Sequence, residues 1–398
     1  MRTSVSPRYN YAARAQHFRP SPVRGVFDIS MKPGMISLAG GNPDLTVLPL
    51  EQLGDASARL IRDRGTEVLQ YGTGAGVDEL REALTDVMSL SGIRSDADDL
   101  LVTSGSQMGI ELITTMLCEP DDVVLAESPT FVGAIGTFLG LEADVVHVDS
   151  DDEGLIPAAL QESIRAVHAT GKKIGFLYTI PSFSNPTGIR LSLERRRQIV
   201  EICRKEGVQI VEDDPYGIIS FDGSVVPAMR SLDDSVVYLG TMSKIYSPGL
   251  RVGWMLAPRE LRDRLQLASE ATTICASVLS QHLALEFLTE FDWRASVETA
   301  TGRYRARAAA LVEGLEEHMP SDVRWTNPTG GFFTWLTLNR DINTESLLQR
   351  GIDDGIVFIP GTAFYADGQG TDTIRLAYSL ASEQDLREGA RRLAGVLS

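Results

Sequence analysis

Seven short runs of mostly apolar residues recur between positions 99 and 257 of this 398-residue chain. They are rich in valine, leucine and isoleucine, which is typical of strands buried on both faces of a largely parallel sheet. The predicted strands are Asp99–Thr103, Asp122–Glu127, Asp144–Val148, Lys173–Thr179, Val208–Glu212, Val236–Gly240 and Val252–Ala257.

Helical patterns lie between several of these strands. Gln107–Cys118 follows the first strand, and Leu193–Glu206 follows the fourth. Ser192 is suited to cap the start of the second helix, and Gly207 is suited to end it. Alternation of strands and helices predicts an α/β fold with helices on both faces of the sheet.

The pattern changes after about residue 268. A long helical stretch, Ser280–Met319, precedes short strand-like runs and a closing helix from Glu383, which together indicate a smaller α+β domain. The runs are Gly331–Leu338, Ile356–Ile359 and Thr373–Ala377. The first 45 residues are rich in proline, glycine and arginine and suit an arm. We expect the arm and part of the small domain at 1–45, a large domain at 46–285, and the small C-terminal domain at 286–398.

Composition is ordinary for a globular protein, with 43% hydrophobic and 23% charged residues. A formal net charge of −17 argues against a nucleic-acid partner, because phosphate backbones select basic surfaces. The three cysteines lie far apart and the five histidines lack metal-ligand spacing, so we expect neither disulfides nor a metal site. No apolar run reaches the roughly 18 residues of a membrane span, and no signal peptide is visible. We therefore expect a cytoplasmic protein that does not bind a membrane.

Lys244 is the first candidate for chemistry. It follows the apolar residues 235–240, and Arg251 lies shortly after it. An amine that forms a Schiff base must be partly neutral, and both an apolar setting and a nearby cation lower the pKa of a lysine. A solvated surface lysine is the alternative interpretation.

Asp213 stands at the carboxyl end of a predicted strand, the edge where open α/β sheets bind ligands. A carboxylate there could keep a pyridine nitrogen protonated through a charge-assisted bond. Tyr216, three residues on, and Asn185, at the end of the preceding strand, could bond a ring oxygen. The segments around Asp213 and Asn185 also fit simple turns.

An anion site is indicated at Ser104-Gly105-Ser106-Gln107, between a strand and a helix. A helix N-terminus offers free N–H groups and a favourable dipole, although a plain helix cap would look the same. Ser243 and Arg251 could complete a phosphate cup. Arg375 lies in an apolar strand-like run and needs an anionic partner. That partner is either a structural salt bridge or the carboxylate of a bound molecule.

Together these groups supply what pyridoxal 5′-phosphate (PLP) chemistry needs: an amine, an acid for the ring nitrogen, and cations for phosphate and carboxylate. The chain resembles the fold-type I PLP-dependent aminotransferases over nearly its whole length. The closer resemblance is to the branch of 2-aminoadipate and kynurenine aminotransferases and of the aminotransferase-like half of GntR/MocR-type regulators. It implies a large domain with a mostly parallel seven-stranded sheet and a smaller α+β domain. It also implies ping-pong transfer of an amino group from an L-amino acid to a 2-oxo acid.

The resemblance implies roles for individual residues. Lys244 would be the Schiff-base lysine and the base that moves the proton, and Asp213 would pair with the pyridine nitrogen. Asn185 and Tyr216 would bond the ring oxygen. The further implied cofactor contacts are Tyr71, Ser104, Gly105, Ser106, Gln107, Phe131, Ser243 and Arg251. Phe131 would stack on the ring, where many relatives have tyrosine, and Tyr71 would reach the phosphate of a partner subunit, which implies a homodimer with shared sites.

The substrate side of the site is also implied by the resemblance. Arg375, with Asn185, would hold the substrate α-carboxylate, and Gly40 and Gly41 would let a backbone loop approach the ligand closely. Arg24 would meet the side chain of a dicarboxylic or other polar substrate. Other reactions of the same fold, such as β-elimination or specialised biosynthesis, stay open. A PLP-binding sensor domain is less favoured, because the arm begins within the first 25 residues and leaves no room for a DNA-binding domain.

Overall fold

The computed structural model describes residues 10–397 apart from 19, 21, 31 and 341, and leaves out the side chains of residues 22, 24 and 27. Its main sheet has seven strands in the order β2-β10-β9-β8-β7-β3-β4. All are parallel except β10, which runs antiparallel to both of its neighbours. Each predicted strand is confirmed: β2 (Leu100–Thr103), β3 (Val123–Glu127), β4 (Asp144–Val148), β7 (Ile174–Thr179), β8 (Ile210–Asp213), β9 (Val237–Thr241) and β10 (Gly253–Leu256).

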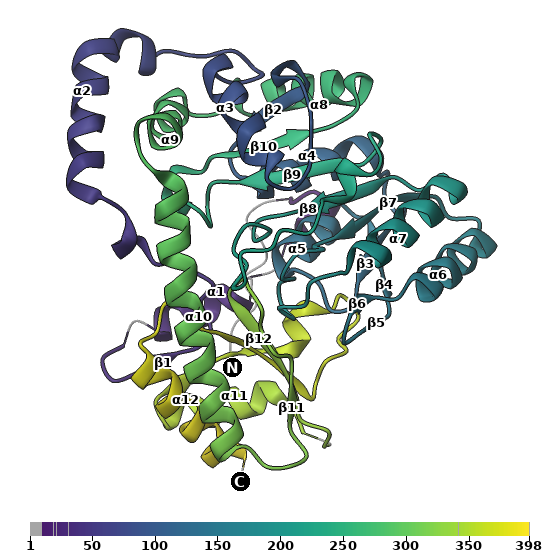
Figure 1. The fold of residues 1–398 in the computed structure, drawn as a ribbon. Helices are drawn as coiled ribbons and strands as arrows, with labels where there is room; N and C mark the ends of the chain where they lie inside the picture. Colours follow the sequence, from purple (N-terminus) through teal and green to yellow (C-terminus); the bar gives the residue numbers. More distant parts are fainter. Residues whose placement is uncertain (1–9, 19, 21, 31, 341, 398) are drawn as a thin grey trace.

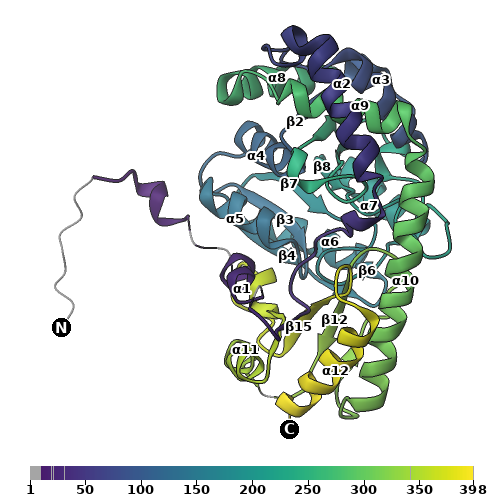
Figure 2. The same cartoon turned by 90° about the vertical axis from the view of Figure 1, so that its left-hand side faces the viewer.

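Helices cover both faces of this sheet, as predicted. Along β3, Val124 belongs to one buried cluster while Val123 and Leu125 belong to another, because successive strand side chains point to opposite faces. Figure 2 shows α4 (Ser106–Leu117) and α5 (Val132–Gly140) on one side of the sheet. The helices α6 (Pro157–Thr170) and α7 (Leu193–Glu206) pack on the other side. The sheet is therefore fully buried, which accounts for its continuous apolar strands.

The predicted caps of α7 are confirmed. Ser192 Oγ accepts a hydrogen bond from the Arg195 N–H at 3.3 Å. Gly207 ends the helix in the left-handed conformation with φ of 69°, which glycine adopts without steric cost. These two residues fix the two ends of α7. They therefore set the point at which the chain leaves the helix for the next strand, β8.

The long helical stretch predicted over Ser280–Met319 is wrong as a single element. The chain forms α9 (Val278–Glu290) and α10 (Trp293–His318) instead. The break occurs because Asp292 caps a new helix, its carboxylate accepting from the Ala295 N–H at 3.0 Å. Figure 1 shows α10 running from the main sheet down to the smaller unit at the bottom of the molecule.

The smaller unit is built on a four-stranded antiparallel sheet in the order β11-β12-β15-β14. These strands span Arg324–Trp325, Phe333–Thr337, Thr373–Ala377 and Ile359–Pro360. Helix α12 (Glu383–Leu397) packs along α10, and α11 (Thr344–Asp353) packs against α12. The α+β character expected of this part is confirmed, although the predicted strand Ile356–Ile359 divides into two. Its first half, β13 (Ile356–Val357), pairs with the N-terminal strand β1 (Ile36–Ser37).

The N-terminal segment is more than an arm. It contains α1 (Pro22–Ser30) and β1, and the side chains of Ile36 and Leu38 are buried in the core. Through β1 this segment pairs with β13, while the division of the chain at 45 and 285, with part of the small domain placed in 1–45, stays a prediction. The remaining elements are α2 (Leu50–Val68), α3 (Asp78–Ser89), β5 (Ser150–Asp151), β6 (Gly154–Leu155) and α8 (Arg259–Thr273). Among the described residues, none of the helices combines the length and apolar composition needed to cross a bilayer.

Candidate active site

The carboxyl ends of three neighbouring parallel strands meet at one edge of the main sheet. Asp213 is the last residue of β8, Lys244 follows β9, and Asn185 follows β7. A cavity of about 660 Å³ opens at this edge, where open α/β sheets bind ligands. The predicted residues that line it are Ser106, Gln107, Phe131, Asn185, Asp213, Tyr216, Ser243, Lys244 and Arg251.

Lys244 projects into this cavity as a partly buried amine. Its Nζ donates a hydrogen bond to the Gly41 carbonyl oxygen at 3.0 Å. Burial, followed by the charges of Arg375 and Arg251, lowers the pKa of Lys244 to about 8, and the Asp213 carboxylate offsets part of that shift. A substantial fraction of the amine is therefore neutral near physiological pH, as a nucleophilic lysine requires.

Asp213 is buried, and only one of its two carboxylate oxygens has a hydrogen-bond partner among the described residues. Its Oδ2 accepts a hydrogen bond from the Tyr178 hydroxyl at 2.7 Å, whereas Oδ1 has no hydrogen-bond partner among the described residues. Burial raises the pKa of Asp213 to about 7, with Asp214 adding to the shift while Tyr178 and Lys244 oppose it. A buried acceptor without a donor is costly, so the lining of this cavity is suited to a ligand that carries a proton to Oδ1.

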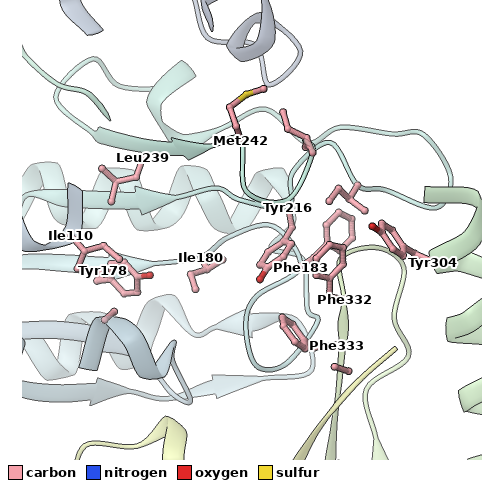
Figure 3. Packing of buried hydrophobic residues seen from close by; sticks show 14 of the residues in the cluster. Ile110, Tyr178, Ile180, Phe183, Tyr216, Leu239, Met242, Tyr304, Phe332 and Phe333 are labelled. Carbon is pink, nitrogen blue, oxygen red and sulfur yellow. The ribbon is translucent and has the colours of Figure 1, made fainter. Parts of the chain in front are cut away.

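Tyr216 and Asn185 lie beside each other above the sheet edge. Tyr216 is 2% exposed, and burial raises the pKa of its hydroxyl, which stays protonated. Its ring packs edge-on against Phe332 and Phe333, as Figure 3 shows. The Asn185 Oδ1 accepts from the Arg375 guanidinium at 2.8 Å, so this amide joins the main sheet to the smaller unit.

A cup of donors forms at the start of α4. Gly105 precedes the helix with φ of 81°, and a Cβ added there would meet Arg251 Nη2 at 2.3 Å, so only glycine leaves room for the guanidinium. Arg251 donates to the Ser243 Oγ at 3.3 Å and to the Ser104 carbonyl at 3.2 Å. The Gln107 side-chain amide already donates to Gly133 O and Thr137 Oγ1. The backbone N–H of Gln107 lies in the first turn of α4, where N–H groups have no intrahelical acceptor, and is suited to bind an anion.

Arg375, on β15, is a buried cation without a carboxylate partner in the described part of the chain. Its Nη1 donates to Asn185 and its Nη2 to the Ala39 carbonyl at 2.5 Å, while Nε has no partner there. The guanidinium stacks on Phe333 and Phe364, with centroid distances of 4.3 and 4.9 Å. Burial lowers its pKa to about 10. Of the two alternatives that the sequence left open, the internal salt bridge is not found among the residues that the structure describes.

Three further predicted residues, Gly40, Gly41 and Tyr71, are not part of the cavity lining. A Cβ on Gly41 would meet the Phe333 ring at 2.4 Å, whereas one on Gly40 would meet only the Asn42 amide at 3.4 Å, so close approach is required at Gly41 alone. Tyr71 is 74% exposed and does not line the cavity. The backbone of Arg24 lies in α1, and its side chain is outside the described residues.

The chain matches the family described as aminotransferase class I and II over residues 33–393. It belongs to that family. The aminotransferase is 33% identical to the aromatic-amino-acid aminotransferase 1 of Thermococcus litoralis over 387 residues, which cover 96% of this chain and 93% of that protein.

Solved structures agree with this assignment. The kynurenine aminotransferase of Pyrococcus horikoshii, solved with the pyridoxamine form of the cofactor, superimposes with a TM-score of 0.92 at 34% identity. The match covers 97% of this chain and 96% of that one. The α-aminoadipate aminotransferase of Thermus thermophilus, solved with a phosphopyridoxyl-leucine adduct, gives a TM-score of 0.89 at 31% identity, covering 97% of both chains. The protein is a PLP-dependent enzyme of amino-group transfer, and neither another PLP chemistry nor a sensor domain is favoured.

The residues of this aminotransferase fit the cofactor. The unpartnered Oδ1 of Asp213 suits a protonated ring nitrogen, the cup of Gly105, Ser243 and Arg251 suits a phosphate, and Lys244 lines the same cavity. In the described part of the chain no group of three or more histidine, cysteine, aspartate or glutamate side chains could hold a metal ion.

Sequence reasoning missed three residues of the site. Tyr178, Phe333 and Phe364 contact Asp213 or Arg375 directly. In the sequence these three residues could be recognised only as aromatic residues of the core. The residues that they contact, Asp213 and Arg375, lie on other elements of the fold. The alternation along β7 does place Tyr178 on the same face as Phe176, but the register against β8 that brings it to Asp213 cannot be read from one sequence.

Proposed function

We propose that this aminotransferase moves the amino group of an L-amino acid to a 2-oxo acid, with Lys244, Asp213 and Tyr216 as its catalytic residues. One observation carries the proposal: the unpartnered carboxylate oxygen of Asp213 and the amine of Lys244 line the same cavity. PLP, when bound, supplies an aldehyde that bonds covalently to an amine and a protonated ring that withdraws electron density from the substrate.

Each residue would then have a defined task. With PLP bound, the Asp213 carboxylate would hold a proton at the ring nitrogen, and Asn185 and Tyr216 would hold the ring oxygen. Lys244 Nζ would take the proton from the substrate α-carbon and serve as the proton-transfer base, and a positioned base of this kind typically supplies ~10²–10⁴-fold in rate. The pKa of about 8 at Lys244 supports this task, because the amine can both accept and release a proton near neutral pH.

The remaining proposed residues bind rather than react. Arg375 and Asn185 hold the substrate α-carboxylate, with Gly40 and Gly41 forming the loop above it, and Phe131 stacks on the ring. Arg251 completes the phosphate contacts, together with Ser104, Gly105, Ser106, Gln107 and Ser243. Arg375 Nε has no hydrogen-bond partner and the guanidinium has no carboxylate partner among the described residues, which supports recognition of the carboxylate of a bound molecule.

We further propose a cytoplasmic homodimer with shared active sites. The high exposure of Tyr71, 74%, supports a role outside its own subunit, at the phosphate of the partner. The donor is proposed to carry an aromatic or acidic side chain, since relatives are named for aromatic amino acids, kynurenine and aminoadipate. Arg24 is the proposed contact for an acidic side chain. Light scattering that finds a fully active monomer would contradict the dimer.

The decisive experiment follows the absorbance spectrum of the PLP-loaded protein. Adding aromatic amino acids, kynurenine or 2-aminoadipate without any oxo acid is expected to convert the cofactor to its pyridoxamine form for at least one donor. Lys244→Ala is expected to abolish this conversion, whereas Lys205→Ala, at an exposed lysine in the last turn of α7, leaves it unchanged. Normal turnover by Lys244→Ala, or failure of the wild-type protein to take up PLP, would refute the assignment.

A further inference from the structure

Tyr178 is a buried tyrosine that the reaction outlined above does not use. It lies on β7 with 0% exposure, and its ring packs edge-on against Phe138 at 5.5 Å. Figure 3 shows it within the apolar cluster, next to Ile110. Its hydroxyl donates to Asp213 Oδ2 at 2.7 Å. Within the described part of the chain, the hydrogen bond of this buried hydroxyl goes to a carboxylate that lines the cavity, and this suggests a functional role for Tyr178.

The geometry points to Tyr178 as the positioning residue of Asp213. By occupying Oδ2, its hydroxyl fixes the rotation of the carboxylate and directs the other oxygen, Oδ1, to the cavity. We infer that it also keeps Asp213 ionised, so that the carboxylate can hold a proton on a bound pyridine nitrogen. This inference rests on the role proposed for Asp213.

A donor to the charged form of a carboxylate favours that form. Asp213 needs such help because burial raises its pKa, and the pKa stays at about 7 only with the Tyr178 bond opposing that rise. Without the Tyr178 bond the pKa of Asp213 would rise further, so that less of the carboxylate would be available at neutral pH as the counter-ion of a pyridinium. The titratable groups that act on Asp213, or on which it acts, are Tyr178, Asp214, Lys244, Tyr216, Tyr238 and Glu127.

The neighbouring strand offers an instructive contrast. Tyr238, on β9, donates to Asp214 Oδ2 at the longer distance of 3.2 Å. Asp214 is also buried, but it does not line the cavity. The two adjacent acids thus have one tyrosine donor each, and only the pair of Tyr178 and Asp213 faces the place where a ligand binds. Tyr178 therefore differs from a tyrosine that merely satisfies a buried acid.

Tyr178→Phe removes the hydroxyl and keeps the ring packing. Because a hydrogen bond to a charged group is involved, the acidic limb of the pH profile of kcat/KM is expected to move up by about one to two pH units. At pH 7 the dissociation constant of PLP from the apoprotein, measured by fluorescence, is expected to rise about tenfold or more. The matched control is Tyr378→Phe, which also loses a buried 2.7 Å hydrogen bond, donated to Gly330 O, but leaves Asp213 untouched. It should lower the Tm without moving the acidic limb or the PLP affinity.

Two further variants complete the test. Replacing Tyr178 by 3-fluorotyrosine gives a more acidic and stronger donor of nearly the same shape, so the acidic limb should move down; this result stands even if Tyr178→Phe does not fold. Asp213→Asn separates the inference from the proposed function. If Asp213→Asn binds PLP as tightly as the wild type, the role of Asp213 itself fails. If Asp213→Asn weakens PLP binding while both Tyr178 variants keep the wild-type limb and affinity, only the inference about Tyr178 is overturned.

Discussion

Substitution of Arg375 is predicted to weaken substrate binding much more than it lowers the stability of the fold. It is a buried guanidinium with two polar partners, Asn185 Oδ1 and the Ala39 carbonyl, and no carboxylate among the described residues. The perturbation is Arg375→Met, which keeps an unbranched side chain of similar length in contact with Phe333 and Phe364. A substrate carboxylate would lose both guanidinium bonds in this variant.

The magnitudes follow from these contacts. Two hydrogen bonds to a charged group are worth about 1.5–3 kcal/mol each, so together ~3–6 kcal/mol of binding is lost, or about 10²- to 10⁴-fold in kcat/KM. Stability behaves differently. Two buried acceptors lose their donor, at ~1–3 kcal/mol each, but an uncompensated buried charge worth several kcal/mol is removed as well. The free energy of unfolding should therefore change by no more than ~2 kcal/mol.

The assay compares two kinds of amino donor. With an α-amino acid, kcat/KM should fall by the stated factor, whereas with a simple amine that has no carboxylate it should hardly change. Arg375→Lys should fall between wild type and Arg375→Met, because an ammonium cannot match a carboxylate with two parallel bonds. Equal losses for the amine and the amino acid, accompanied by a drop of several kcal/mol in urea unfolding, would show that Arg375 is structural and would refute this reasoning.

Three further predictions concern the cofactor cup, the lysine and a helix cap. Gly105→Ala should raise the PLP dissociation constant about tenfold, since the backbone conformation of Gly105, with φ of 81° and ψ of 165°, is essentially limited to glycine and costs another residue ~1–3 kcal/mol, and the added Cβ would displace Arg251; Gly136→Ala, with no atom within 4 Å of the added carbon, is the control. The rate of PLP uptake by the apoprotein should rise with pH and level off above about 8, because the lowered pKa of Lys244 releases its proton there; a rate still climbing through pH 10 would contradict this. Ser192→Ala should cost ~0.5–2 kcal/mol in urea unfolding and Ser192→Gly only a few tenths, and equal losses would argue against a side-chain cap.

The main sheet was predictable because each of its strands is a short apolar run between polar segments. Local signals also sufficed for α7, where Ser192 and Gly207 mark the two ends. They failed at residues 291–292, where the helical periodicity continues but the Asp292 side chain starts a new helix. A single aspartate within a helical pattern does not by itself predict a helix cap. It can be recognised as a cap only once the chain is known to turn at that point.

Long-range pairing limited the prediction of the site. The motifs around Lys244 and Asp213 were visible because each lies at a strand end, where the polar residue contrasts with the apolar run before it. The contact of Tyr178 with Asp213 depends on the register of two strands, and the partner of Arg375 depends on the approach of two sheets. Such contacts are properties of the assembled fold. The sequence alone therefore left open whether the partner of Arg375 is a structural salt bridge or the carboxylate of a bound molecule.

The bond between Arg375 and Ala39 has a consequence for how the protein is made. Its two residues are 336 positions apart in the chain. At ≈5–20 residues per second, a ribosome needs roughly 20–70 s to add the second after the first. For most of that interval, until Ile356 and Val357 of β13 have been added, β1 has no partner strand, whereas the main sheet, whose last strand ends at Leu256, can already form. The nascent chain must therefore shield Ile36 and Leu38 from wrong partners until β13 emerges, and the hydrogen bond between Arg375 and Ala39 is among the last contacts of the enzyme to form.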